Sequence, residues 1–145
     1  MRPSALPAWE RYPTLPVDED NLALYEGWLD HEFRLPQCVA CGKWHAPAHP
    51  LCPFCWSFDL APRKLSGRGT VHLSILLHQG PAMEGVTYPY PVVTVELEEQ
   101  KGLRFTSTAV GGTGLVPIGT PVELVWLDRG GAPFPAFRPR QGARA

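Results

Sequence analysis

The sequence predicts a mainly β protein with one N-terminal helix, a cysteine-bearing ribbon and a small β-barrel. Segments after residue 68 alternate apolar and polar side chains, which is the pattern of half-buried strands. All four cysteines fall within residues 38–55 as two CxxC pairs. Seventeen prolines and fourteen glycines favour short strands and turns over long helices. A chain of 145 residues has the length of about one domain.

The N-terminal part of the chain predicts one helix over residues 19–33. Acidic residues at 18–20 suit a helix N-terminus, and apolar residues follow at helical spacing. Leu24 and Trp28 lie off that apolar stripe, so we expect a second surface to cover them.

Four segments predict strands of one barrel. Residues 69–79 place Val71, Leu73, Ile75 and Leu77 on one side, and residues 91–98, 103–110 and 121–127 alternate in the same way. A fifth strand over 133–137 contains prolines, which cannot donate to a ladder and predict an edge position. Strands this close together suit a closed or half-closed barrel, because closure leaves few free edges.

These patterns divide the chain into five parts. They are an extended N-terminal arm (1–17), a helical segment (18–35), the cysteine-bearing ribbon (36–62), the barrel (63–139) and a flexible tail (140–145).

Charge and hydropathy exclude several classes of protein. The net charge is −1 and the pI is about 6.5, so no bulk field would attract nucleic acid or anionic membranes. No run of eighteen apolar residues occurs, and prolines interrupt the N-terminus where a secretory signal needs a continuous apolar run. We therefore expect a cytoplasmic protein.

The spacing C-x2-C-x10-C-x2-C predicts a zinc site with Cys38, Cys41, Cys52 and Cys55 as ligands. Each CxxC pair can form a tight turn that presents two thiolates, and Gly42 follows where a positive φ is needed. Four thiolates close the shell, which indicates structural zinc. Iron in the same shell and a redox dithiol are the alternatives. His45 and His49 are alternative ligands, otherwise partly exposed loop residues.

No catalytic constellation is evident in the sequence. The serines lie in no Gly-x-Ser-x-Gly elbow, and no cysteine remains to act as a nucleophile. We therefore expect a chain that is not catalytic alone.

The loop over residues 80–89 carries more apolar side chains than a solvated loop needs. Met83, Val86, Tyr88 and Tyr90 either form a contact surface or fold back over an open barrel end. Around the ribbon, Trp44, Trp56 and Phe58 are expected to pack it onto the helix or barrel.

Over residues 18–139, the chain resembles the family called domain of unknown function thirty-five. The resemblance rests on the helix and on five segments together: the ribbon CxxCGxxxxP…CPxC, then SGRGTV, YPYPVVTVELEEQKGLRFTSTAVG, IGTPVELVW and PFPAFRP. The resemblance implies a rubredoxin-like zinc ribbon joined to an OB-fold. It also implies an accessory subunit of thiolase-superfamily or lipid-transfer-protein-like enzymes that act on acyl-CoA thioesters. It carries over the four zinc cysteines and no catalytic residue.

The main hypothesis is therefore a hetero-oligomer in which this chain docks on a thiolase-fold partner and shapes a CoA thioester entrance. Arg68 joins Met83, Val86, Tyr88 and Tyr90 as the candidate partner or CoA-entrance surface. The partner would perform retro-aldol or thiolytic cleavage of a steroid- or aromatic-derived acyl-CoA. Two alternatives remain open: a nucleic-acid-binding ribbon and OB-fold, and a stand-alone CoA-binding protein whose cations meet the phosphates (Arg63, Lys64, Arg68 and Arg104).

Overall fold

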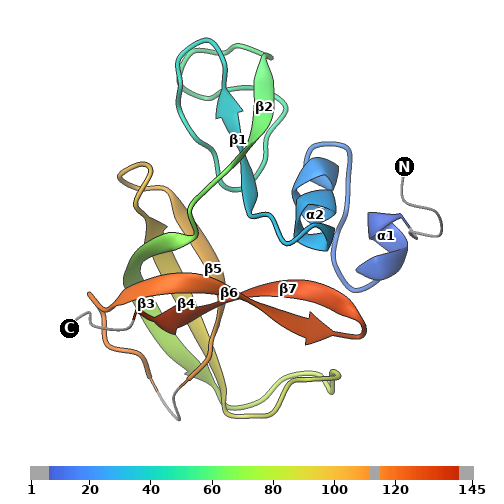
Figure 1. Ribbon diagram of the computed structural model, residues 1–145, viewed down its shortest axis with the longest axis vertical. Coiled ribbons are helices and arrows are strands. Elements are labelled where there is room, and N and C mark those ends of the chain that lie inside the picture. Colours follow the sequence, from blue (N-terminus) through green and yellow to red (C-terminus); the bar gives the residue numbers. More distant parts are fainter. Residues whose placement is uncertain (1–6, 112–114, 141–145) are drawn as a thin grey trace.

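The computed structural model describes residues 7–111 and 115–140, as two short helices and seven strands (Figure 1). In chain order they are α1 (Ala8–Arg11), α2 (Leu22–Leu29), β1 (Arg34–Cys38), β2 (Leu60–Lys64), β3 (Arg68–Leu77), β4 (Tyr90–Leu97), β5 (Arg104–Ala109), β6 (Pro121–Arg129) and β7 (Ala132–Pro139). Within these ranges, neither helix is long and apolar enough to cross a membrane.

Strands β3 to β7 form a closed barrel in the order β3-β4-β5-β7-β6, and the start of β3 pairs with β6 to close it. All pairs are antiparallel except β5 with β7. Strands β1 and β2 form a separate two-stranded sheet that stands above the barrel in Figure 1. The predicted fold class, a helix followed by a zinc ribbon and an OB-fold-type barrel, is confirmed.

The barrel core is continuous with the base of the ribbon. Its buried members come from the strands and from the segments that enter them: Phe33, Leu35, Leu65, Val71, Val93, Val95, Leu97, Leu103, Val122 and Phe137. Phe33 and Leu35 precede or lie within β1, so the ribbon is anchored by apolar burial at its base. Gly67, at a φ of +81°, allows the approach of β6, because a Cβ there would lie 2.7 Å from Leu124 Cβ.

Strand β3 carries a β-bulge at His72 that reverses the predicted alternation. The register with β4 shifts between Val71 and Leu73. Val71 is 1% exposed, whereas Leu73, Ile75 and Leu77 are exposed by 53, 51 and 41%. The expectation that these four side chains share one side is therefore wrong, because one inserted residue moves every later side chain to the opposite face.

Strand β7 lies between β5 and β6, although its prolines predicted an edge strand. The N–H of Val110 donates to the carbonyl of Phe137, so the odd-numbered residues of β7 face β5. Pro133 and Pro135 share that parity, so the ladder to β6 needs no N–H group from either proline. Their carbonyl oxygens accept hydrogen bonds from two side-chain hydroxyls at 2.5 Å, those of Tyr12 and Ser107.

Helix α2 is shorter than predicted and ends at Leu29, because His31 adopts a φ of +57°. The expected cover for its off-stripe side chains is confirmed. Leu24 packs against the barrel core, and Trp28 is buried edge-on against Phe105 of β5 and Phe134 of β7.

The predicted extended arm folds onto the body of the protein in its described part. Residues Ala8–Arg11 form α1, and Tyr12 at its end packs edge-on against Trp28 with ring centroids 5.5 Å apart. The arm is folded and not extended because its apolar side chains are buried: Ala8 and Tyr12 pack in one cluster with Trp28 and Ala132. Residues 1–6 of the arm and 141–145 of the tail lie outside the described residues.

Candidate metal centre and surrounding surfaces

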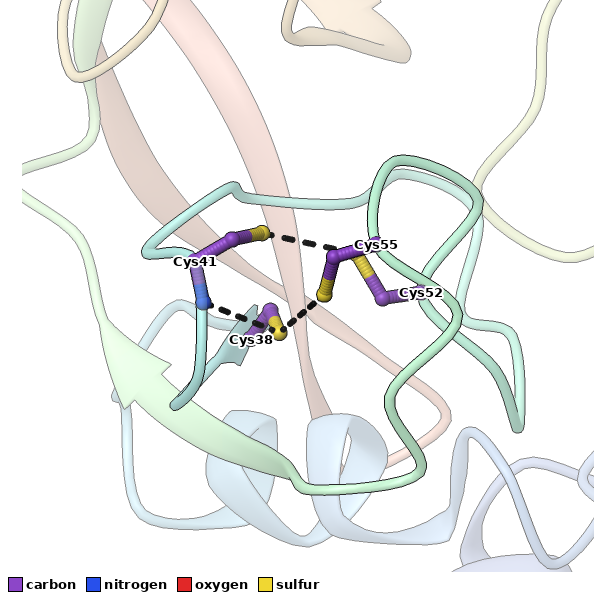
Figure 2. A group of neighbouring side chains, drawn as sticks. All are labelled: Cys38, Cys41, Cys52 and Cys55. Carbon is purple, nitrogen blue, oxygen red and sulfur yellow. Dashed lines mark hydrogen bonds between the residues drawn. The ribbon is translucent and has the colours of Figure 1, made fainter.

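Two turns of the same geometry bring the four cysteines together at the end of the ribbon (Figure 2). In the first turn, the N–H of Gly42 donates to the carbonyl of Cys38, and the N–H of Cys38 donates to Lys43. In the second, Trp56 and Ser57 make the same two bonds with Cys52. Each turn needs a left-handed residue after its second cysteine. Gly42 has a φ of +80° as predicted, and Trp56 a φ of +63°.

The four sulfur atoms form a compact cluster, with every ligand atom within 4.8 Å of the others. Across the two turns, the Sγ atoms of Cys38 and Cys55 lie 3.6 Å apart, as do those of Cys41 and Cys52 (Figure 2). Tetrahedral zinc with Zn–S bonds of about 2.3 Å separates its sulfur ligands by about 3.8 Å. The cluster therefore fits one zinc ion held by four thiolates.

The thiols need a cation if all four are to ionise together. A backbone N–H of Cys41 donates to Cys38 Sγ and lowers the pKa of that thiol to about 7. For Cys55, the N–H of Ser57 lowers the pKa, but desolvation and the neighbouring thiols raise it more, to about 12. Crowded thiolates repel one another, and a bound divalent cation removes that penalty.

The chain thus carries structural zinc in a closed four-cysteine site. Cys38, Cys41, Cys52 and Cys55 would hold it, and the ion would cross-link the two turns without an open position for water. Cys38 and Cys52 are buried, whereas Cys41 and Cys55 are exposed. The centre therefore lies at the protein surface with one side against the ribbon.

The two histidines between the cysteine pairs differ in their surroundings. His45 is 4% exposed, not partly exposed as predicted, and its ring stacks on Phe54 at 5.9 Å. Burial lowers the pKa of His45, and His49 adds to this effect, so the neutral ring is favoured. His49 is exposed. Neither histidine joins the cysteine cluster.

The aromatic side chains of the ribbon divide into one that packs against the barrel core and three that are mostly exposed. Trp44 packs against the barrel core, as predicted. Trp56 and Phe58 were expected to pack as well, but they are exposed by 77 and 79%. Phe54 is 62% exposed and carries Lys43 over its ring at 5.5 Å. We call the four large exposed apolar residues of the ribbon the ribbon patch: Val39, Phe54, Trp56 and Phe58.

The candidate entrance surface is not continuous. Met83 is exposed, but the Tyr88 hydroxyl donates to the carbonyl of Pro81, which folds the loop on itself. Tyr90 hydrogen-bonds to Arg129, and Val86 is half-buried.

Arg68 lies at the other end of β3 and pairs with Glu98 at 2.6 Å. Because β3 runs from residue 68 to 77, the two ends are about 30 Å apart. The structure therefore separates Arg68 from the loop residues.

A cleft of about 400 Å³ lies where α2, β1 and β5 meet, and no sequence pattern predicted it. Tyr25, Trp28 and Phe105 provide apolar wall, and Arg34 and Arg104 bring guanidinium groups to it. Arg34 is engaged by Glu32 at 2.5 Å, whereas Arg104 is 4.0 Å from Glu96. Only the tertiary arrangement brings these segments together.

Comparisons with known proteins place this geometry in a family. Residues 26–61 match "ChsH2, rubredoxin-like zinc ribbon domain" and residues 62–127 match "ChsH2, C-terminal OB-fold domain". A chain of the solved "Ltp2-ChsH2(DUF35) aldolase" is 33% identical, with a TM-score of 0.78; the match covers 86% of this chain and 98% of that chain. The protein belongs to the ChsH2 (DUF35) family. A DUF35 protein of unknown function from Sulfolobus solfataricus shares the fold at 15% identity, a TM-score of 0.57, and coverage of 92% of this chain and 93% of that chain.

Two further relatives of this DUF35 chain match it over part of their length. The alpha subunit of 3-oxo-4,17-pregnadiene-20-carboxyl-CoA hydratase from Mycobacterium tuberculosis is 34% identical over 113 residues, covering 75% of this chain and 34% of that subunit. A DUF35 domain-containing scaffold protein from Methanocaldococcus jannaschii is 34% identical over 92 residues, covering 62% of this chain and 64% of the scaffold protein. The chain thus spans about a third of the hydratase subunit and less than two thirds of the scaffold protein.

Proposed function

We propose that this DUF35 chain is a zinc-stabilised accessory subunit, not catalytic alone, that docks on a thiolase-superfamily, lipid-transfer-protein-like enzyme. One observation carries the proposal: the chain matches 98% of a chain in the Ltp2-ChsH2(DUF35) aldolase at 33% identity. The partner would act on acyl-CoA thioesters and cleave a carbon–carbon bond, by retro-aldol or thiolytic chemistry, in steroid side-chain degradation. The hydratase relative is also a subunit, and its name includes a steroid-type carboxyl-CoA.

The surface chemistry supports a binding role. The ribbon patch presents three aromatic rings with exposures between 62 and 79%. Exposed aromatic clusters of this kind mark protein interfaces, where Trp and Phe contribute large buried area. A closed four-thiolate zinc centre would hold Phe54 and Trp56 on a rigid turn, because both flank the ligand Cys55 in the chain.

We also place the CoA thioester near the partner interface, with its acyl group in the cleft between α2, β1 and β5. The cleft has aromatic walls and a volume of about 400 Å³, within the range of small-molecule sites. Arg104, whose nearest acidic partner is 4.0 Å away, could meet a carboxylate or phosphate there. The cytoplasm suits this assignment, because a reducing compartment keeps the four thiols available for metal.

Co-expression tests the proposal. The full chain would be produced with the Ltp2-type protein of its own organism, and the purified material examined by size-exclusion chromatography with light scattering. We expect one heteromeric peak and aldolase or thiolase activity that neither protein shows alone. Two separate peaks, with partner activity unaffected by this chain, would contradict the proposal.

A nucleic-acid role would draw on the same ribbon patch, since Lys43 lies beside its rings. Its test is a gel shift with single-stranded and duplex oligonucleotides at low salt. We expect no shift, because the net charge of the chain is −1 and three barrel arginines, Arg68, Arg104 and Arg138, lie within 4.0 Å of glutamates. A shift that disappears on substitution of Trp56 would favour the alternative.

A further inference from the structure

Beyond its bulge, β3 is paired on one side only within the part of the chain that the structure describes. Residues 68–70 pair with β6, and Val71 still exchanges hydrogen bonds with Gly119 and Thr120. From Leu73 to Leu77 the strand pairs with β4, and no backbone partner on its other side occurs among residues 7–111 and 115–140. In the described part of the loop before β6, the N–H of Val116 donates to Ser74 Oγ.

The direction of the free backbone groups follows from the register. Leu76 is opposite Pro91, which has no N–H and whose carbonyl accepts a bond from Thr108 on β5. The Leu76–Pro91 pair is therefore a non-hydrogen-bonded pair, and Leu76 directs its own N–H and C=O away from β4. Two residues earlier, Ser74 has the same parity. Ser74 and Leu76 thus present their backbone groups at the open edge.

The side chains beside this edge are apolar. Leu73, Ile75 and Leu77 point outward with exposures of 53, 51 and 41%. Ile75 is directly opposite Val92 of β4, so the apolar surface continues across the sheet. Long, apolar and unpaired strand edges are the surfaces on which a second chain adds a strand, and a protein that meets no partner usually covers or charges them.

We infer that the Leu73–Leu77 edge of β3 receives an extended strand of the partner subunit, with apolar residues at alternate positions. The inference rests on the proposed function and assigns its docking surface. Backbone groups of Ser74 and Leu76 supply main-chain hydrogen bonds, and Leu73, Ile75 and Leu77 supply the apolar contact. Alternate apolar residues in the incoming strand would meet these side chains, because successive side chains of a strand point to opposite faces.

Residue-resolved amide exchange tests this directly in the full chain, alone and with the Ltp2-type protein of its own organism. In the free chain, the amides of Ser74 and Leu76 should exchange fast, and those of Leu73, Ile75 and Leu77, bonded to β4, slowly. On complex formation, exchange at Ser74 and Leu76 should slow by about tenfold or more. A complex that leaves both amides unchanged overturns the inference while the proposed function stands. Absence of any complex overturns both.

Side-chain substitution gives an independent reading. The side chain of residue 75 points to solvent in the free chain, so the Ile75→Lys variant should melt at the wild-type temperature. Its affinity for the partner should fall about tenfold or more. Trp9→Lys is the matched control, since Trp9 is 55% exposed on α1, and affinity should be unchanged. Equal loss of affinity in both variants, or no loss in Ile75→Lys, would overturn the assignment of this edge.

Discussion

The side-chain amide of Gln100 makes two hydrogen bonds with the backbone of Trp44. Its Oε1 accepts from the Trp44 N–H at 2.9 Å, and its Nε2 donates to the Trp44 carbonyl at 3.1 Å. This pairing imitates one step of a β-ladder and joins the ribbon to the β4–β5 turn, 56 residues away in the chain. It helps fix how the zinc centre is oriented over the barrel.

Gln100→Ala should lower the free energy of unfolding by about 1–3 kcal/mol, because both Trp44 backbone groups lose a part-buried partner. Urea denaturation measures the change. Gln79→Ala is the matched control, since Gln79 is exposed, and it should leave the midpoint unchanged. Equal midpoints for the two variants would mean that the hydrogen bonds between Gln100 and Trp44 contribute nothing to stability.

Cys52→Ser should abolish stoichiometric zinc binding, because its buried thiolate is one of four ligands. Folding of the ribbon depends on the metal, whose binding contributes about 10–16 kcal/mol in isolated zinc peptides near neutral pH. Metal analysis and thermal denaturation measure the loss, and a chelator should reproduce it in the wild type. His49→Ala should keep about one zinc per chain, and zinc lost from that variant would restore His49 as a ligand.

Trp56→Gly should keep or raise stability, because glycine adopts the φ of +63° without strain. Trp56→Ala retains the left-handed backbone cost and should be about 1 kcal/mol less stable than Trp56→Gly. Denaturation of the two variants separates backbone strain from side-chain loss. Both should bind the partner more weakly, because both lack the indole of the ribbon patch. Full affinity in either variant would exclude that ring from the interface.

The buried phenol of Tyr12 should make the free energy of unfolding depend on pH in the alkaline range. Burial raises the Tyr12 pKa to about 12, against a countering effect of Arg11. A raised folded-state pKa stabilises the protein fully below pH 10, and this contribution is lost as pH rises towards 12. The loss should be on the order of 2 kcal/mol.

Tyr12→Phe should be less stable than the wild type at neutral pH, because the hydroxyl donates to the Pro133 carbonyl. Its stability should then fall less steeply between pH 10 and 12. Denaturation of both proteins across this range isolates Tyr12 from other alkaline titrations. Parallel pH curves would show that the phenol ionises freely in the folded protein.

Much of the architecture could be predicted because its signals are local. The CxxC spacing predicts the metal ligands, since each pair of thiolates belongs to one short turn. Alternation located β4, β5 and β6 within about two residues of their observed bounds. The positive φ at Gly42 followed from the same turn geometry, but the equivalent position at Trp56 carried no sequence signal.

The sequence by itself determined the zinc ligands, the order of the elements and the positions of most barrel strands. The tertiary structure alone decided which faces are buried. A bulge at one residue turned Leu73, Ile75 and Leu77 outward, because period-two patterns identify side chains that share a face only while the register is unbroken. Likewise, β7 could enter the barrel because its prolines happen to face β5 and not β6. Local chemistry thus fixes the metal centre, whereas the surfaces available to a partner depend on how distant strands align.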